Sequence, residues 1–148
     1  MEERFRTFTV LIMKINRYIH RIKTEEMQEF ELKSPHVSCL YYLYKSGGST
    51  AKGLCDVCAE DKGAISRSVE YLEEKGCVFC QSGEKKRYNA ELILTEKGEK
   101  IAEKIVKKID SVLDQASLGV LEEERSVLYK SLSLICNNLE NICKKYGD

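Results

Sequence analysis

One stretch of the chain, residues 61–76, combines a helix pattern with a small basic face. Asp61 is a suitable N-cap, because its carboxylate can accept hydrogen bonds from the free N–H groups of a first turn. Gly76 suits the end, where glycine adopts the left-handed conformation without strain. The apolar residues, at i, i+4 and i+7, are Ile65, Val69 and Leu72. The opposite face carries Lys62, Gly63, Ser66, Arg67 and Glu70. Such a helix can pack by its apolar side and present the other side to a nucleic-acid groove.

The residue types on that face suit DNA. Arg67 can pair bidentately with O6 and N7 of guanine in the major groove. Lys62, Ser66 and the backbone N–H groups at the helix start can hold phosphates. Gly63 and Ala64 leave room for a close approach. An ordinary solvent-exposed amphipathic helix has the same pattern, so this helix alone does not decide the function.

A second basic cluster follows in a predicted β-hairpin. After Gly76 the apolar period changes to 2, which predicts strands over about 77–82 and 89–95. The polar tip between them holds three adjacent cations that suit the minor groove or its phosphates, Lys85, Lys86 and Arg87. A charge run is usually a solvated loop, but a hairpin directly after a groove-sized helix has the arrangement of a wing. Residues 62–88 hold six cations against four anions, so affinity should depend on a dimer and on salt.

Composition sets the limits for these motifs. The chain has 148 residues, which fits one domain over 1–148. Its 24 Lys and Arg residues balance 24 Asp and Glu residues, so any nucleic-acid footprint must be local. We find no apolar run long enough to span a membrane and no signal-peptide core at the start. Seven cysteines without an export signal predict reduced thiols and a cytoplasmic location.

Long apolar seams lie at both ends of the sequence. In residues 1–30 the apolar positions step by 3 and 4, at Phe5, Phe8, Ile12, Ile15, Ile19 and Ile22. The predicted last helix, about 121–145, repeats this spacing at Leu128, Leu132, Ile135, Leu139 and Ile142. These seams exceed what a small central unit can cover, so they predict a homodimer built from the ends.

Three further helices complete the prediction. Ser34 as N-cap and Pro35 at the first position start a helix over 35–45. Its residues on one side are Val37, Leu40, Tyr41 and Tyr44. Ser49 or Thr50 caps a helix over about 51–59, in which Leu54, Cys55 and Cys58 face inward. Thr95 caps a helix over 96–116, which Gly98 weakens locally.

The order of these elements, together with four motifs, resembles the multiple-antibiotic-resistance regulator (MarR) family. The motifs are Leu-Cys-Asp-Val-Cys at 54–58, Asp-Lys-Gly-Ala-Ile-Ser-Arg at 61–67, Leu-Glu-Glu-Lys-Gly at 72–76 and Leu-Ile-Leu-Thr-Glu-Lys-Gly at 92–98. The resemblance implies a mainly α fold with a small β-hairpin wing. A winged helix-turn-helix over 35–95 is then inserted between dimerisation helices over 1–34 and 96–148.

The resemblance also implies a function. The helix at 61–75 would be the recognition helix and the hairpin at 77–95 the wing. The protein would be a cytoplasmic homodimer that binds palindromic operators in double-stranded DNA, as a repressor released by a small anionic or aromatic effector. That effector would bind near Tyr41 and Tyr44. Family wings usually read Asp-x-Arg-Arg, whereas this chain has Glu-Lys-Lys-Arg at 84–87, so the wing arginine maps best to Arg87.

The cysteines offer a rival interpretation. Cys55 and Cys58, then Cys77 and Cys80, have the spacing of a four-cysteine zinc site. Against zinc, the second pair falls on a predicted strand, where i and i+3 point to opposite faces. Buried structural thiols fit better. A redox role is a further alternative, although the family's peroxide sensors carry their reactive cysteine in the first helix and residues 1–38 contain none.

No catalytic triad, phosphate loop or nucleotide motif is present in the sequence, so neither an enzyme nor a bound cofactor is predicted. Three functions remain open. The first is the ligand-responsive DNA-binding transcriptional regulator. The second is a thiol- or zinc-responsive regulator on the same fold. The third is a winged-helix protein-interaction dimer without DNA binding, which the small local charge surplus keeps open.

Overall fold

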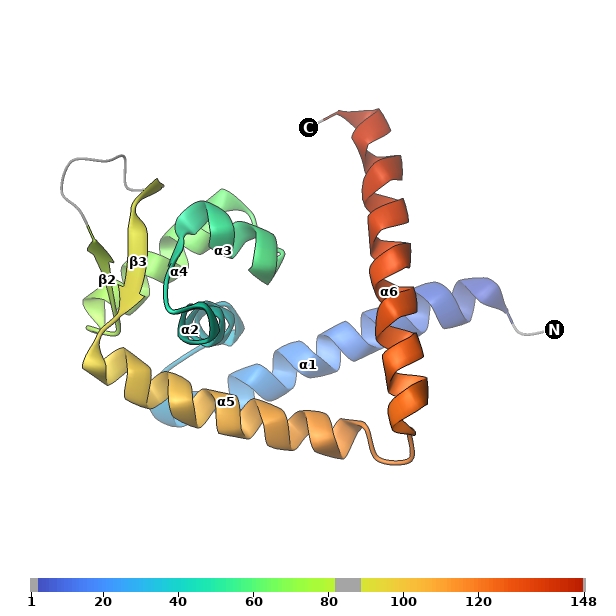
Figure 1. The fold of residues 1–148 in the computed structure, drawn as a ribbon, viewed down its shortest axis with the longest axis horizontal. Helices are drawn as coiled ribbons and strands as arrows, with labels where there is room; N and C mark the ends of the chain where they lie inside the picture. The colour runs from blue at the N-terminus through green and yellow to red at the C-terminus, as the bar shows by residue number, and fades with distance from the viewer. Residues whose placement is uncertain (1–2, 82–88, 148) are drawn as a thin grey trace. The chain divides into compact units, whose positions relative to one another are not determined.

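The computed structural model describes residues 3–81 and 89–147 (Figure 1). The chain forms two compact units, Met1–Ile109 and Asp110–Asp148, whose boundary falls inside the long helix α5 (Glu96–Ala116). The predicted fold class, mainly α with a small β-hairpin wing, is confirmed. No helix among the described residues is long and apolar enough to cross a membrane.

The first unit opens with a long helix that carries the N-terminal seam. A π-helical segment, η1 (Arg6–Leu11), runs directly into α1 (Ile12–Glu26), and one 3-10 turn, η2 (Gln28–Phe30), follows. Glu31 then takes a left-handed conformation with φ of 57°, which ends this turn. The long helix predicted over 1–30 is therefore confirmed up to Glu26, and Met27 beyond it is buried in the core.

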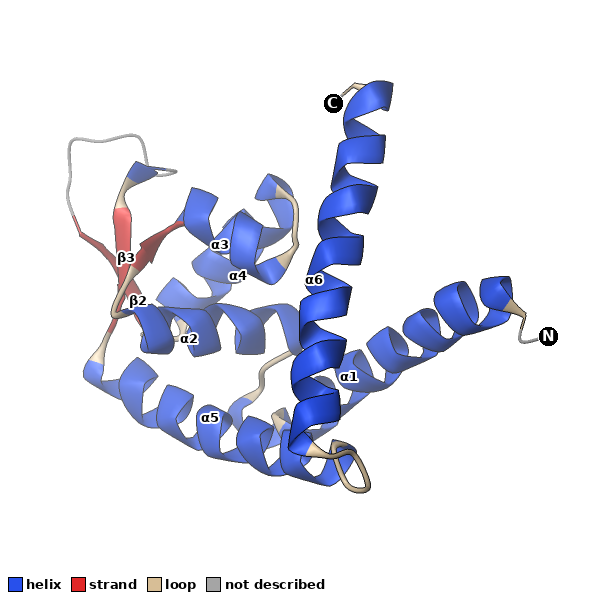
Figure 2. Ribbon diagram, turned by 45° about the vertical axis from the view of Figure 1, so that its right-hand side comes forward, coloured by secondary structure: helices blue, strands red, loops and turns tan. Residues whose placement is uncertain are grey.

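Three short helices form the centre of this unit, and Figure 2 shows them beside a small sheet. They are α2 (Ser34–Ser46), α3 (Ala51–Cys58) and α4 (Lys62–Glu74). Thr50 caps α3 as predicted, because its Oγ1 accepts from the N–H of Gly53 at 3.0 Å. Gly47, with φ of 75°, ends α2 in the left-handed conformation.

The sheet has one strand more than the sequence predicts. Its strand order is β1 (Ser49–Thr50), β3 (Glu91–Leu94), β2 (Val78–Gln81), with all pairs antiparallel. The two predicted strands are β2 and β3, both shorter than expected. β1 escaped prediction because two residues are too few to show an alternating pattern.

Two expectations for α2 are wrong. Its N-cap is Lys33, not Ser34: the extended Lys33 donates its backbone N–H to Nδ1 of His36 at 3.1 Å, and Ser34 is buried. Tyr44 does not share the buried side with Val37 and Leu40, because it is 39% exposed. Cys39 and Leu43 take that place in the core.

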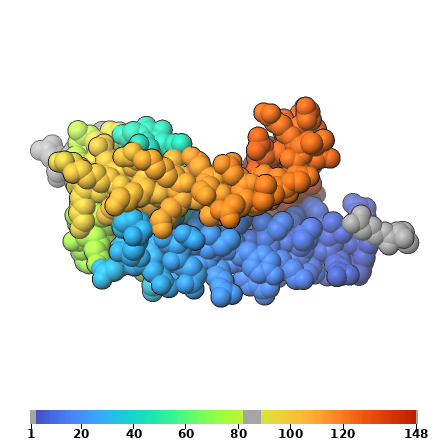
Figure 3. Space-filling model, turned by 90° about the horizontal axis from the view of Figure 1, so that it is seen from below, coloured from blue at the N-terminus to red at the C-terminus, as the bar shows by residue number. Residues whose placement is uncertain are grey.

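The start of α5 is fixed closely to the sheet. Thr95 caps it as predicted, accepting from the N–H of Gly98 at 3.0 Å. A Cβ at Gly98 would overlap the carbonyl group of Cys77, so this position needs glycine for a close approach rather than merely tolerating it. Further along α5, Lys108 donates to the carbonyl oxygen of Glu26 at 3.1 Å, and Figure 3 shows α5 running beside the N-terminal segment.

The second unit contains the end of α5, then α6 (Glu122–Cys143) and a 3-10 turn, η4 (Lys144–Tyr146). The predicted terminal helix over 121–145 is confirmed in these bounds. All residues of α6 are described, and none of them is buried. Its seam is exposed or half-exposed, with Leu128 and Leu139 at 48% and 46%. The seam of this helix is therefore not covered by the chain itself.

Candidate nucleic-acid interface

Helix α4 lies on the protein by its apolar face. Its first turn is closed by Asp61, whose Oδ1 accepts from the N–H of Ala64 at 2.7 Å, as the sequence predicts. Ile65, Val69 and Leu72 are 1%, 4% and 0% exposed and belong to the main core. This face packs on α2 and α3. The opposite face of the same helix is thereby held toward solvent.

That solvent-facing surface holds the predicted contact residues of α4. Lys62, Gly63, Ser66 and Arg67 are exposed, and Ala64 is half-buried. A Cβ at Gly63 would lie 3.3 Å from Nη1 of Arg67 and 3.3 Å from Oδ1 of Asp61. The guanidinium group therefore lies over the first turn, beside the helix N-terminus. A permanent cation, a hydroxyl group and the positive end of a helix dipole share this surface, which suits anions.

A short turn links α3 to α4. Cys58 ends α3, and Ala59 follows in the left-handed conformation with φ of 53°. The N–H of Glu60 donates to the carbonyl oxygen of Cys55 at 3.2 Å, and Asp61 then caps α4. Two helices joined by such a three-residue turn form a helix-turn-helix, so the direction of α4 depends on how α3 ends.

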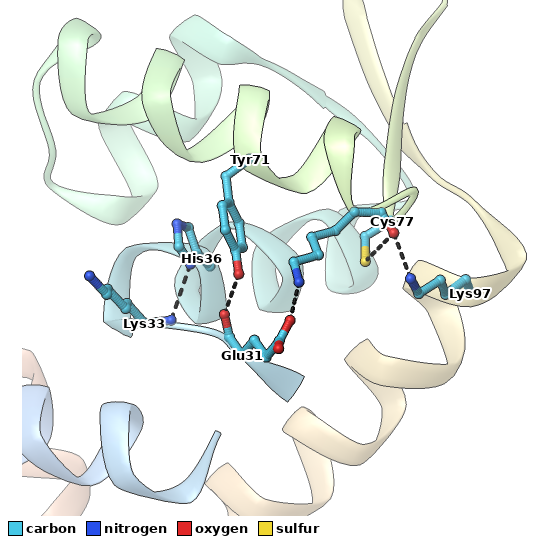
Figure 4. Close-up of polar contacts among 7 residues, drawn as sticks. Glu31, Lys33, His36, Tyr71, Cys77 and Lys97 are labelled. Carbon is cyan, nitrogen blue, oxygen red and sulfur yellow. Dashed lines mark hydrogen bonds and ion pairs between the residues drawn. The ribbon is translucent and has the colours of Figure 1, made fainter. Parts of the chain in front are cut away.

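The other end of α4 is fixed by contacts that the sequence did not reveal (Figure 4). The Tyr71 hydroxyl donates to the carbonyl oxygen of Glu31 at 2.5 Å, and Lys75 pairs with the Glu31 carboxylate. The Tyr71 ring stacks on His36 with centroids 4.1 Å apart and planes 6° apart. These contacts join the connection between α1 and α2 to the recognition-helix candidate. Glu31 lies 40 positions from Tyr71, so no local pattern signals them.

The ionisable groups of this cluster respond to their neighbours. A hydrogen bond and charge from Lys75 lower the pKa of Glu31, and the same pairing raises the pKa of Lys75. Burial, followed by the charge of Lys33, lowers the pKa of His36. A neutral His36 fits its contact, because Nδ1 must carry a free lone pair to accept from the Lys33 N–H.

Helix α5 fixes the same end of α4 from another side. Nζ of Lys97 donates to the carbonyl oxygen of Lys75 at 2.6 Å, and the Cys77 thiol approaches the same oxygen at 3.9 Å. The Thr95 hydroxyl donates to the carbonyl oxygen of Gly76 at 2.5 Å. Gly76 itself has φ of 73°, as predicted for a helix end. The carbonyl groups at the end of α4 are thus satisfied by side chains from α5 and its cap.

The hairpin follows directly from this anchored end. Val78 of β2 pairs with Leu94 of β3, and Gln81 pairs with Glu91. Val78 and Leu94 face the core, whereas Phe79 is 44% exposed. The predicted wing cations, Lys85, Lys86 and Arg87, lie outside the described residues.

The predicted effector residues do not lie together. Tyr41 is half-buried beneath Nζ of Lys45, 5.7 Å from its ring centroid, whereas Tyr44 is exposed. A pocket of about 230 Å³ opens between α2 and α3. Its lining residues are Tyr42, Lys45, Ser46, Ser49, Leu54 and Val57. The tyrosine beside Tyr41, rather than Tyr41 or Tyr44, therefore forms part of this pocket.

The two Cys-x-x-Cys pairs do not make a metal centre in the part of the chain that the structure describes. No group of three or more His, Cys, Asp or Glu residues there could hold a metal ion. All seven cysteines lie within the described ranges, and all are thiols rather than disulfides. Cys77 is buried beside the end of α4, whereas Cys55 and Cys58 lie on α3.

Comparison with known proteins agrees with this architecture. A family model described as "MarR family" matches residues 30–87. The HTH-type transcriptional regulator BilQ of Clostridium symbiosum is 31% identical over 105 residues, covering 70% of this chain and 73% of the relative. The uncharacterized HTH-type transcriptional regulator YwoH of Bacillus subtilis is 34% identical over 98 residues, covering 64% and 71%.

Solved structures share the fold over almost the whole chain. A putative MarR-family regulator from Listeria monocytogenes, solved with a 26mer DNA, superposes with a TM-score of 0.83 at 23% identity, covering 100% of this chain and 97% of that one. A MarR protein from Peptoclostridium difficile gives 0.83 at 18% identity, covering 98% and 93%. The fold defines a winged helix-turn-helix protein. The chain belongs to the MarR family and is a transcriptional regulator of that family.

Proposed function

We propose that this regulator binds palindromic operators in double-stranded DNA as a homodimer and represses transcription until a small molecule releases it. The observation that carries the proposal is the two-sided build of α4. Its apolar face is buried at Ile65, Val69 and Leu72, and its small basic face is exposed. A helix held in this way can enter a major groove without moving.

The contact residues have separate roles in this proposal. Arg67 reads a guanine edge, and Lys62, Ser66 and the N-terminal N–H groups of α4 hold phosphates. Gly63 and Ala64 let the backbone approach. Lys85, Lys86 and Arg87 contact the neighbouring minor groove or its phosphates. The DNA present with the Listeria relative supports this use of the fold.

Dimerisation through the ends is supported by uncovered apolar surface. Among the described residues of η1, α1 and α6, none is buried. Phe5, Ile15 and Ile19 are 70%, 49% and 45% exposed. Contiguous apolar surface of this kind marks an interaction site, and a two-fold dimer would cover it while presenting two copies of α4 to the two halves of a palindrome.

The proposed effector is a small aromatic or anionic molecule that binds near Tyr41 and Tyr44. An aromatic ring beside the Lys45 ammonium offers stacking and charge to such a molecule. The molecule must bind the DNA-incompetent state more tightly, since an equal affinity for both states shifts nothing. A panel of aromatic acids, scored by thermal stability and DNA affinity, tests this part. If no member shifts either quantity, effector control of this kind is wrong.

The central experiment selects bound sequences from random duplex DNA and then compares variants on the selected operator. Arg67→Ala should weaken binding by about 1–3 kcal/mol per half-site and relax preference at one base position. Lys107→Ala removes a comparable charge from α5, where Lys107 pairs with Glu103 at 3.2 Å, and should bind like the wild type.

Both variants should keep the wild-type helicity and dimerisation, because neither side chain is buried. Equal affinity and selectivity of Arg67→Ala and wild type would show that α4 does not read the DNA. That result would favour a winged-helix protein-interaction dimer without DNA binding.

A further inference from the structure

Two cysteines that the sequence does not pair lie side by side between α2 and α3. Cys39 in α2 is completely buried, and Cys58 is the last residue of α3 and half-buried. The Cys39 thiol donates a hydrogen bond to the sulfur of Cys58. The two Cys-x-x-Cys motifs drew attention to pairs within one element, whereas this pair joins two helices.

The surroundings make the two thiols unequal. The hydrogen bond from Cys39 and the ammonium group of Lys23 lower the pKa of Cys58, against burial and the Glu60 carboxylate. The bond to Cys58 and burial raise the pKa of Cys39, which stays protonated. Lys23 is held in place, because its Nζ donates to Oγ of Ser38 at 3.0 Å. One accessible sulfur is thus activated beside a buried thiol.

We propose that Cys58 and Cys39 form a thiol–disulfide exchange site that closes to an intramolecular disulfide with a low-molecular-weight disulfide as oxidant. The Cys58 thiolate attacks one sulfur of the oxidant, breaks its S–S bond and releases one thiolate, which leaves a mixed disulfide on Cys58. The Cys39 sulfur then attacks Cys58, loses its proton and releases the second small thiol. Two protein thiols are oxidised, and one small disulfide is reduced to two thiols.

The position of Cys58 connects this step to the helix-turn-helix. Ala59 and Glu60 lead from Cys58 directly to the N-cap of α4, Asp61. A disulfide holds its sulfur atoms at about 2.05 Å, which is closer than a hydrogen-bonded pair of thiols. Closing it must draw the end of α3 toward α2 and turn the start of α4. We therefore expect oxidation to weaken DNA binding, a consequence that rests on the proposed function.

The chemical test treats reduced full-length protein with oxidised glutathione and identifies the products by peptide mass spectrometry. Wild type should lose two of its seven thiols and yield a peptide linked through Cys39 and Cys58. Cys39→Ala should stop at one glutathionyl group on Cys58, and Cys58→Ser should form neither product. Cys55→Ser is the matched control, because it removes a half-buried thiol one turn earlier in α3, and it should behave like wild type.

Two results would overturn the exchange site: wild type that keeps all seven thiols, or a linked product that forms equally well in Cys58→Ser. Melting curves of each reduced variant show that it is folded, which matters most for the buried Cys39. Even if Cys39→Ala fails to fold, the comparison of Cys58→Ser with Cys55→Ser decides the question.

The DNA-binding test uses the same preparations. Oxidised wild type should bind the selected operator about 5–150-fold more weakly, the usual range of coupling between two sites, and dithiothreitol should restore it. Unchanged affinity of the oxidised protein would overturn the link to α4. If reduced and oxidised protein both fail to bind any DNA, the proposed function fails, while the linked peptide still establishes the exchange site.

Discussion

Two helices of this protein carry apolar stripes of similar spacing and treat them in opposite ways. In α4, Ile65, Val69 and Leu72 are 1%, 4% and 0% exposed. In the helix formed by η1 and α1, Phe5 and Ile15 are 70% and 49% exposed. The same period therefore predicts an apolar face equally well in both places. It does not say which surface covers that face.

The difference lies in what else the chain places nearby. Helix α4 follows α2 and α3 at short range, and these supply its covering surface. The first and last helices have seams as long as α4 or longer, yet the described chain leaves them uncovered. We expect a second copy to cover them, so the stripes should respond differently to the same kind of mutation.

The largest effect should come from a charge in the C-terminal seam. Ile135→Asp would bury an unpaired carboxylate in the proposed dimer interface, which costs several kcal/mol, and should yield monomers at micromolar concentration. Sedimentation or size-exclusion with light scattering measures this. Asn137→Asp adds the same charge to the same helix off the seam and should remain dimeric. Wild type that is itself monomeric at micromolar concentration would contradict the dimer.

The next effect should come from the covered stripe. Leu72→Ala leaves a cavity under α4 and should lower the free energy of unfolding by about 2–5 kcal/mol, measured by urea denaturation. Dimerisation through the ends should survive. Val57→Ala, on the exposed side of α3, should cost less than about 0.5 kcal/mol. Equal losses in the two variants would mean that the α4 stripe does not carry the core.

The same contrast explains what could be predicted from sequence. Asp61, Thr95 and Gly76 were predicted as caps and a helix end because each signal lies within a few residues of its partner. The bond from Tyr71 to Glu31 spans 40 positions and has no local signature. In the candidate site, the exposed face of α4 follows from helical period alone.

Other parts of the site were beyond sequence reasoning for similar reasons. The pairing of Cys39 with Cys58 depends on how α2 and α3 pack, whereas motif spacing pointed to pairs within one element. The cap of α2 was misplaced because histidine is not a usual partner for a helix start, yet His36 accepts from Lys33.

A smaller effect should come from the anchored end of α4. Tyr71→Phe keeps the ring stacked on His36 but removes the hydrogen bond to Glu31, which should cost about 0.5–1.5 kcal/mol. Urea denaturation measures the loss, and dimerisation should not change. Tyr146→Phe, at a hydroxyl 80% exposed, is the control and should be neutral. If the two variants match, this hydrogen bond does not stabilise the end of α4.

The smallest effect concerns pH and His36. The ordinary pKa of histidine is 6.5, and burial followed by Lys33 lowers it in the folded protein. Below pH 6.5 the unfolded chain therefore takes up a proton that the folded chain resists. Stability should fall as the pH drops from 6.5 toward the lowered pKa and should level off below it. The slope stays under the one-proton limit of about 1.4 kcal/mol per pH unit.

Urea denaturation between pH 8 and about 5 separates this group from its neighbours. Glu31 also has a lowered pKa, but its contribution is lost only below its ordinary value of 4.5. His36→Gln should flatten the wild-type slope below pH 6.5, because no imidazole remains to charge. His20→Gln, at an exposed position of α1, should keep that slope. If His36→Gln instead keeps the full wild-type slope, protonation of His36 does not oppose the contact with Lys33, and the start of α2 does not depend on a neutral ring.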